Sequence, residues 1–290
     1  MPPEKVSVKP PATFKEQLQI LRTRGIVISN DQLALQMLEK INYYRLTAYA
    51  LEFKKDDHYI EGTTFSRICS LYEFDRQLRY LLMGLIEQVE IAFRTHISYS
   101  ISHTYGSLGH LEACHFKDEF FHSKFLEKLD KEYRRSNEIF IKHHLCKYNG
   151  VIPVWVAVEV LSFGDLSKLF ANMKNVDKNR ISKEYYQIPF DYIESWLKCL
   201  SVIRNICAHY GRLYNRPLTS RPKLDSQTRR LGLDSARIFA PILVLKQLTL
   251  DYDQWTNFIT HLEALIHRFN EDIHLAHIGF PDNWESLLRN

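Results

Sequence analysis

The sequence predicts an all-α protein, and three observations support this prediction. Apolar residues recur at helical spacing through most of the chain, above all over residues 65–105. Strand signals are weak, since the β-rich run at 151–160 has the length and the setting of a helix. Gly and Pro number only 10 each among 290 residues, so we expect no long flexible linker. The sequence contains no internal repeat.

The N-terminal part predicts a small helical module. Residues 1–12 are rich in Pro and Lys and are expected to form a flexible lead-in. Thr13, followed three residues later by Glu16, has the pattern of a capping box that begins a helix. A second helix-start signal lies at 29–31. We therefore expect residues 13–53 to form a helical module that packs on the remainder of the domain.

After a polar loop at 54–63, the chain is expected to be mainly helical, with an irregular stretch at 108–122, within a single domain over residues 13–290. A basic, polar loop is expected at 217–234, and Gly164-Asp165 is expected to interrupt the helical pattern. The periodicity predicts helices over 65–105, 123–146, 155–163, 166–173, 195–215, 236–250 and 252–270.

The composition argues against a membrane-spanning protein and against a disulfide-rich secreted one. No apolar run approaches the roughly 20 residues that a membrane-spanning helix needs, and the N-terminus lacks the apolar core of a secretion signal. The number of cysteines is odd and no CxxC pair occurs, so we expect reduced thiols buried as small hydrophobic groups. These cysteines are Cys69, Cys114, Cys146, Cys199 and Cys207. A cytoplasmic protein is expected.

Charge permits a nucleic-acid partner without requiring one. The formal net charge is +4 and the pI is about 8.7. Basic residues cluster over 212–230 and again over 131–147. The run His143-His144-Leu145-Cys146 looks like a metal site, but adjacent residues rarely converge on one ion and no matching second half exists. We expect neither a metal nor another cofactor.

The most informative segment is Arg204-Asn205-Ile206-Cys207-Ala208-His209, within the predicted helix over 195–215. At about 100° per residue, a polar stripe within about 40° of one line contains Glu194, Lys198, Ser201, Asn205, His209, Arg212 and Arg216. The residues expected to face a core on the opposite side are Trp196, Cys199, Leu200, Ile203, Cys207 and Tyr210. A stripe with this composition can bind a phosphate and move a proton, although most stripes opposite an apolar face are only solvated.

Helix geometry separates Arg204 from the other two polar residues of this segment. Arg204 lies about 100° from Asn205 and about 140° from His209 around an ideal helix. Its side chain can therefore join His209 only by curling around the helix or by acting together with a second subunit.

Within the long predicted helix, Glu90 and Arg94 have i, i+4 spacing. A surface ion pair is one interpretation of this spacing. The other is a carboxylate that orients a catalytic arginine, and it requires this helix to pack against the helix that carries Arg204.

Four segments, in order, carry a family resemblance: Arg24-Gly25-Ile26 with Ile41–Leu46; Glu87–Arg94; Pro153-Val154-Trp155 through Glu159 to Phe163–Ser167; and Arg204–His209 continued by Arg212–Arg216. The ending Gly279-Phe280-Pro281 with Trp284 fits the same pattern. With these segments the chain resembles bacterial Abi-like proteins of the AbiD/AbiF type, a divergent branch of the HEPN superfamily. The resemblance implies a HEPN-like helical bundle with a helical insertion, which dimerises and acts on RNA in phage defence.

The resemblance also implies an R-x4-H site made of Arg204, Asn205 and His209, with the arginine of one subunit serving the histidine of another. His209 is then the proton carrier and Arg204 the phosphate stabiliser in metal-independent attack of a 2′-hydroxyl on its neighbouring phosphate. The residues expected to bind the RNA are Arg212, Asn215, Arg216, Arg221 and Lys223.

Two other functions stay open. The protein could bind a structured RNA without cutting it, for instance as a toxin that a small antitoxin RNA restrains. It could also be a helical interaction scaffold whose polar stripe faces solvent.

Overall fold

The computed structural model describes residues 10–289 and confirms the all-α fold class. Within these residues it has fourteen α-helices and one two-stranded hairpin. Residues 1–9, which make up most of the expected lead-in, lie outside the described part. The chain consists of two compact units. The smaller comprises the chain up to Gln77 with Leu265–Ile273, and the larger comprises Leu78–Ala264 with the C-terminal segment from His274.

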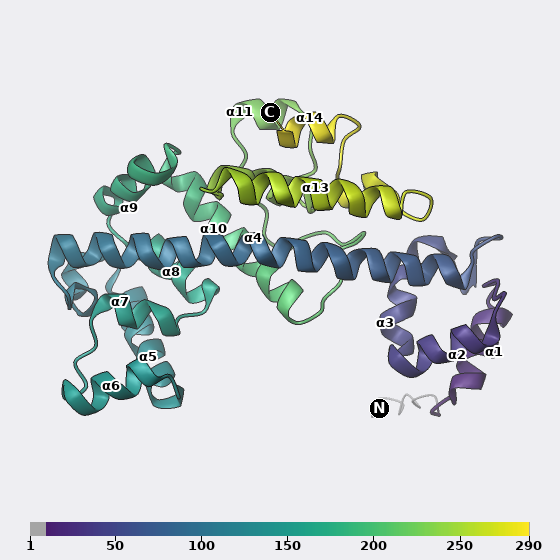
Figure 1. Ribbon diagram of the computed structural model, residues 1–290, viewed down its shortest axis with the longest axis horizontal. Coiled ribbons are helices and arrows are strands. Elements are labelled where there is room, and N and C mark those ends of the chain that lie inside the picture. The colour runs from purple at the N-terminus through teal and green to yellow at the C-terminus, as the bar shows by residue number, and fades with distance from the viewer. Residues whose placement is uncertain (1–9, 290) are drawn as a thin grey trace, which may run out of the picture. The chain divides into compact units, whose positions relative to one another are not determined.

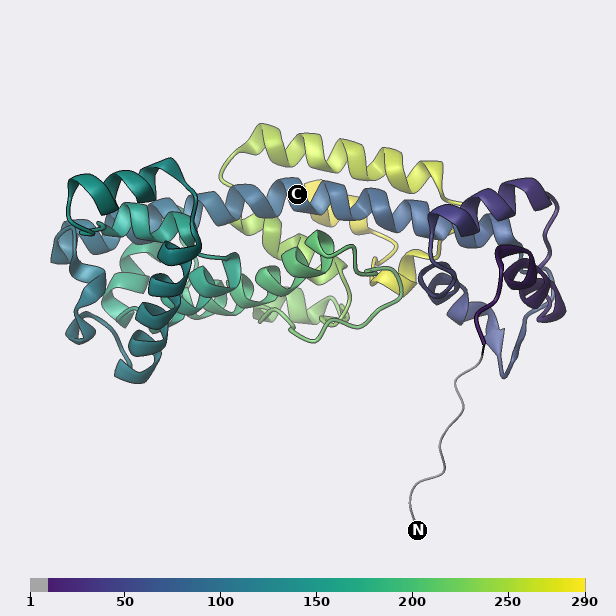
Figure 2. The same cartoon turned by 90° about the horizontal axis from the view of Figure 1, so that it is seen from below.

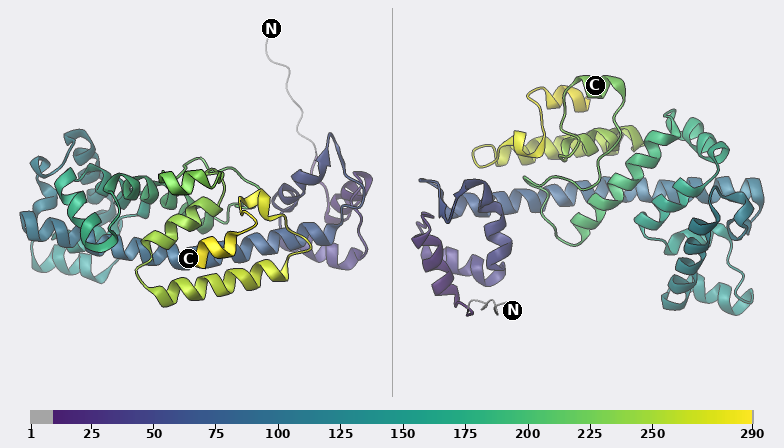
Figure 3. Two further views of the ribbon diagram at one scale, coloured as in Figure 1. Left: turned by 90° about the horizontal axis from the view of Figure 1, so that it is seen from above. Right: turned by 180° about the vertical axis from the view of Figure 1, so that it is seen from behind.

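The smaller unit contains the expected N-terminal module and the beginning of the long helix α4 (Figure 3). Its other elements are α1 (Phe14–Thr23), α2 (Asp31–Lys40), α3 (Tyr43–Thr47), a 3₁₀ turn (Ala48–Phe53), β1 (Lys54–Lys55) and β2 (His58–Tyr59). Both predicted helix starts are confirmed. Thr13 caps α1 in a complete capping box with Glu16, and the side chain of Asn30 accepts from the Leu33 amide to cap α2.

The expected polar loop at 54–63 is instead a short antiparallel hairpin. Asp56 supplies the positive φ, 56°, that its tight turn needs. The hairpin is fixed to the end of α1, because the Tyr59 amide donates to the Arg24 carbonyl at 2.8 Å. Gly25 adopts φ 95°, and a Cβ there would lie 3.3 Å from the Tyr59 carbonyl oxygen. A glycine therefore ends α1 where the hairpin crosses it closely.

The helix α4 (Phe65–Tyr105) confirms the predicted span, and it continues from the smaller unit into the larger one (Figure 1). The further helices are α5 (Glu119–Arg135), α6 (Ile139–Lys147), α7 (Val154–Ala157), α8 (Phe163–Asn172), α9 (Asn175–Ile181), α10 (Phe190–Ala208), α11 (Ser226–Arg230), α12 (Phe239–Leu248), α13 (Tyr252–Arg268) and α14 (Trp284–Arg289). In the larger unit α13 runs alongside α4 (Figure 2).

Three predicted helix boundaries are wrong in the middle of the chain. The helix expected over 123–146 is two helices, α5 and α6, because the backbone becomes extended at Ser136 and Glu138. The segment expected to be helical over 155–163 ends earlier, at Val160, because the backbone is extended at Leu161. Gly164-Asp165 does not interrupt a helix but lies in the first turn of α8, because Ser162 caps that helix one residue before it begins.

The loop expected at 217–234 contains the short helix α11, which Asp225 caps by accepting from the amides of Gln227 and Thr228. No helix within residues 10–289 is both long enough and apolar enough to span a membrane.

Helix α10 forms the centre of the larger unit and packs on α8 and α12. The predicted core face is confirmed for five of its members, which are all buried: Trp196, Cys199, Leu200, Ile203 and Cys207. Ser201, predicted for the polar stripe, is also buried, and its hydroxyl donates to the Lys198 carbonyl. This packing leaves the polar side of the end of α10, which carries the Arg204–His209 motif, open to solvent.

Candidate functional site at the end of α10

The predicted helix over 195–215 ends at Ala208, so the expected stripe is shorter than predicted. His209 is the C-cap residue, and Tyr210 takes a left-handed backbone with φ 57°. The Gly211 amide donates to the Ile206 carbonyl at 2.7 Å and the Tyr210 amide to the Cys207 carbonyl at 3.1 Å. These two bonds are those of a Schellman motif, which terminates a helix.

This ending corrects two further expectations. Arg212 and Arg216 do not continue the helical stripe beyond His209, because the chain turns away from the helix axis. Tyr210, expected in the core, has 68% of its surface exposed. The polar face of the last turns of α10 therefore ends with Asn205 and His209, followed at once by an exposed tyrosine.

The turn after α10 is held from several sides. The guanidinium of Arg79, a residue of α4 that is 4% exposed, donates to the Gly211 carbonyl at 3.2 Å. Tyr214 is fully buried, and its hydroxyl accepts from the His274 amide at 2.9 Å. Asn215, which has φ 47°, accepts from Arg237 at 3.2 Å. Sequence reasoning missed Arg79, since nothing local marks a partner 132 residues away.

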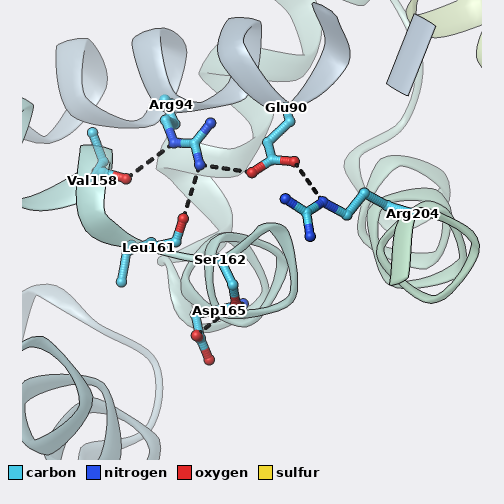
Figure 4. Close-up of polar contacts among 7 residues, drawn as sticks. All are labelled: Glu90, Arg94, Val158, Leu161, Ser162, Asp165 and Arg204. Carbon is cyan, nitrogen blue, oxygen red and sulfur yellow. Dashed lines mark hydrogen bonds and ion pairs between the residues drawn. The ribbon is translucent and has the colours of Figure 1, made fainter. Parts of the chain in front are cut away.

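Glu90 links the long helix to the motif. Its carboxylate accepts from Arg94 at 2.6 Å, and its second oxygen lies 3.6 Å from Nε of Arg204 (Figure 4). Arg94 also donates to the backbone carbonyls of Val158, at 3.2 Å, and Leu161, at 2.8 Å. The Glu90 and Arg94 side chains are 8% and 15% exposed, whereas that of Arg204 is 34% exposed.

These contacts fix the position of the Arg204 guanidinium. Arg94 is anchored to backbone atoms, it holds Glu90, and Glu90 in turn holds the Nε side of Arg204. The partly exposed remainder of the guanidinium is available to a further anion. Of the two interpretations of the Glu90–Arg94 spacing, a simple surface pair does not describe this geometry, because both side chains are largely buried and Glu90 reaches Arg204.

Asn205 and His209 lie apart from the two arginines, Arg94 and Arg204, that Glu90 joins. Both are exposed, and within residues 10–289 neither side chain forms a hydrogen bond to another residue. No hydrogen bond or ion pair within the described chain joins either of them to Arg204. The single chain thus brings Glu90, Arg94 and Arg204 together and leaves Asn205 and His209 open to solvent on the neighbouring face of α10.

The residues expected to bind RNA separate into two groups. Arg212, Asn215 and Arg216 lie in the turn directly after α10. Lys223 is paired with Asp191 and lies over the Tyr192 ring, at the first turn of α10. Along the helix axis this is about 27 Å from His209.

Arg221 shares a surface hollow with Asp191, Glu194 and Lys198, also toward the beginning of α10. The chain between Arg216 and Lys223 therefore runs back along α10 toward its beginning. The hydrogen bond that Trp196 Nε1 donates to the Lys223 carbonyl shows this course. In one chain, Arg221 and Lys223 therefore lie toward the beginning of α10, away from the Arg204–His209 motif.

The predicted stripe also contains Glu194, which serves another purpose. Its carboxylate accepts at 2.9 Å from Lys178, whose side chain is completely buried. Lys178 further donates to the Ala171 carbonyl. Glu194 thus neutralises a buried cation at the α9–α10 contact, since an unpaired buried ammonium would be very costly.

The cysteines are only partly as expected. Cys199 and Cys207 are buried, but Cys114 and Cys146 are exposed. Burial raises the pKa of the Cys199 thiol to about 12, so this cysteine is not a nucleophile at neutral pH. Within residues 10–289 no group of three or more His, Cys, Asp and Glu side chains has an arrangement that could hold a metal ion.

Comparison with known families matches the chain to one family model. The model is described as Abi-like protein, and it covers residues 36–215. This range is more than half of the chain and includes Glu90, Arg94 and the whole Arg204–His209 motif. Comparison with curated proteins finds no match, and comparison with solved structures finds none either.

Proposed function

Because the chain belongs to the Abi-like family of abortive-infection proteins, we propose that it is a phage-defence endoribonuclease whose reaction centres on Arg204 and His209. The observation that carries the proposal is the Glu90–Arg204 contact, which holds a partly exposed guanidinium at the end of α10 that also carries a solvent-exposed asparagine and histidine. The resemblance of Arg204–His209 to the R-x4-H motif of HEPN ribonucleases supports the same reaction class.

The proposed chemistry needs no metal. His209 accepts the proton of an RNA 2′-hydroxyl or returns a proton to the departing 5′-oxygen, as imidazole does near neutral pH. Arg204 donates to the non-bridging phosphate oxygens, on which negative charge increases in the transition state. Asn205 supplies a further donor from the same exposed turn. Glu90 and Arg94 position Arg204 and do not touch the substrate.

The separation of Arg204 from His209 in one chain supports a composite site in a homodimer. In such a site, Arg204 of one subunit acts with His209 of the other. Mixing Arg204→Ala protein with His209→Ala protein tests this arrangement, because the mixed dimer retains one intact pair. We expect the mixture to cleave RNA when neither variant does so alone. Full specific activity of a monomer separated by dilution would contradict the composite site.

A second candidate function rests on the same exposed surface. With Arg212 and Arg216 in the turn beside it, the motif can clamp a phosphate without cleaving the strand, as a protein restrained by a structured antitoxin RNA would require. An EDTA-containing assay separates the two functions. Native protein and His209→Ala are incubated with end-labelled RNA, with His267→Ala as the matched control because His267 is an exposed histidine on α13.

Cleavage by native protein and His267→Ala, with binding but no cleavage by His209→Ala, is the result that the nuclease predicts. Equal, salt-sensitive binding by all three proteins with no cleavage by any would replace the nuclease by the clamp.

A further inference from the structure

A cavity of about 270 Å³ lies between α5 and α8, away from the Arg204–His209 motif. Phe116, Phe121, Phe125 and Leu169 give it an apolar, mainly aromatic lining. Its volume is slightly below the roughly 300–1,000 Å³ of pockets that hold drug-sized ligands, so it suits one planar ring with a small substituent. Phe121 has 61% of its surface exposed and forms an open side of this lining.

The inner wall of the cavity is buried and carries a hydrogen-bond acceptor. His122 lines the cavity, is 3% exposed and stacks on Phe116 at 4.7 Å between ring centroids. Its Nε2 donates to the His110 carbonyl at 3.0 Å, because a carbonyl oxygen can only accept. In the neutral ring Nδ1 is then an acceptor, and it has no hydrogen-bond partner among residues 10–289.

The cavity is held in place by the end of α8. The Asn172 side chain accepts from the Asp118 amide and donates to the Asp118 carbonyl, both at 3.0 Å. The Lys117 amide donates to the Asn172 carbonyl at 2.8 Å. These bonds fix the segment that carries Phe116 and begins α5, so a ligand does not have to pay for ordering the wall.

Cations surround the cavity. Lys124, Lys128, Lys131 and Lys168 line it, against only Glu127 and Asp165. Lys124 pairs with Glu127 at 3.0 Å, and Lys168 lies 3.7 Å from Asp165. Lys131 forms no ion pair within the described chain, which leaves its ammonium available to an anion.

The first turn of α8 lies between the cavity and the two arginines, Arg94 and Arg204, that Glu90 joins. Asp165 lines the cavity and accepts from the Ser162 hydroxyl at 2.7 Å (Figure 4). Leu161, directly before Ser162, supplies the carbonyl to which Arg94 donates. The cavity and the Glu90–Arg204 contact therefore lie on either side of one helix start.

We propose that this cavity binds one nucleobase together with its phosphate, an inference that rests on the proposed action on RNA for the source of its ligand. The base stacks on Phe121 and donates an N–H to Nδ1 of His122, and the phosphate lies against Lys131. Aromatic stacking, one in-plane acceptor and a ring of lysines are the features with which proteins hold unpaired bases. The base belongs either to a strand that continues toward Arg204 or to a free nucleotide.

Binding measurements with matched variants test the proposal. The ligands are the four ribonucleoside 5′-monophosphates and a 2′-O-methyl tetranucleotide. The nuclease could cleave neither, because a 5′-monophosphate has no 3′-phosphodiester to break and the tetranucleotide has no free 2′-hydroxyl to attack it. Calorimetry compares native protein with Phe121→Ala and with Phe120→Ala. Phe120 is the neighbouring phenylalanine, it is 65% exposed, and it does not line the cavity.

We expect Phe121→Ala to weaken binding of at least one ligand about tenfold and Phe120→Ala to change it less than about twofold. Lys131→Glu should weaken the same binding and reduce its salt dependence. Dependence on Phe121 with a monophosphate identifies a free nucleotide, and the same dependence with the tetranucleotide alone identifies a base within a strand. Absence of binding by both ligands, or equal effects of the two phenylalanine variants, would overturn the proposal.

The experiments can reject the nucleobase cavity and the proposed nuclease activity independently of each other. Phe121-dependent binding by a protein that does not cleave RNA would keep the cavity and reject the nuclease. Cleavage that requires His209, together with no Phe121-dependent binding, would do the reverse.

Discussion

Glu90 Oε2 lies 3.6 Å from Arg204 Nε, while the other oxygen of the same carboxylate accepts from Arg94 at 2.6 Å. One buried carboxylate thereby joins two arginines, one of which is bound to backbone carbonyls and one of which is partly exposed. Two cations close to a single anion attract a second anion, and in the proposed reaction that anion is the RNA phosphate.

Replacing Glu90 tests this relationship. Glu90→Gln keeps the shape but leaves Arg94 and Arg204 without their carboxylate, so we expect a loss of about 2–4 kcal/mol in the free energy of unfolding. We also expect a lower kcat for RNA cleavage, because Arg204 loses its anchor. Glu87→Gln, one turn earlier on α4 and exposed, is the control and should change stability by less than about 0.5 kcal/mol. Urea unfolding measures the stability of both variants. Equal stability of Glu90→Gln and Glu87→Gln would show that Glu90 does not hold the two arginines in place.

The left-handed backbone at Tyr210 predicts an unusual order of stability. With φ 57°, Tyr210 occupies a conformation that costs residues with a Cβ about 1 kcal/mol relative to glycine. Tyr210→Gly should therefore be more stable than Tyr210→Ala by about 1 kcal/mol, although both lose the same ring. Thermal unfolding of the two variants measures the difference. An alanine variant as stable as the glycine variant would mean that the Schellman turn is not kept in solution.

Acid should destabilise the protein through a buried histidine. Burial lowers the pKa of His110 to about 4, with His122 acting in the same direction, and both ring nitrogens of His110 lack a partner among the described residues. The unfolded chain binds this proton near pH 6.5, so it holds more protons than the native state between about pH 6.5 and 4. Stability therefore falls as the pH falls through this range, by up to about 3 kcal/mol for this group.

His96, whose pKa burial also lowers to about 4, adds to the same trend. The check is urea unfolding of native protein and His110→Leu at pH 7.5 and pH 4.5. The variant should lose less stability than native protein between the two pH values. An identical loss would show that His110 does not titrate across this range.

If the protein acts on RNA as proposed, we expect position along α10 to separate the cations that contact the RNA from those that do not. Arg216 follows the motif, whereas Lys223 is paired with Asp191 at the far end of the helix. We expect Arg216→Ala to weaken RNA binding and to lower the salt slope by about one, and Lys223→Ala to leave both within error. Filter binding at several salt concentrations provides the measurement. The opposite ranking would place the RNA along the 217–224 segment instead.

Local sequence signals predicted the helix starts and helix spans that depend on neighbouring residues. The starts of α1 and α2 follow from capping side chains within three residues, and the full span of α4 follows from a long apolar periodicity. The end of α10 was missed because its left-handed residue is Tyr210, not the glycine that marks most such ends. The break at Ser136 was missed because neither glycine nor proline stands there.

The site was predictable in composition but not in arrangement. The spacing of Glu90 and Arg94 suggested two interpretations, and only the packing of α4 near α10 brings Glu90 to Arg204. Arg79 and the return of the chain along α10, which moves Lys223 away from the motif, depend on tertiary contacts between distant residues. The cavity between α5 and α8 combines segments about 50 residues apart and left no pattern in the sequence.

The most direct test of the proposed reaction compares two RNA substrates in EDTA. One is an all-ribose oligonucleotide, and the other carries a single 2′-deoxyribose at the mapped cleavage position. The account predicts that native protein cleaves the first to a 2′,3′-cyclic phosphate and leaves the second intact at that position, and that Arg204→Ala and His209→Ala cleave neither. Cleavage of both substrates by native protein, or unchanged cleavage of the first by His209→Ala, would contradict it.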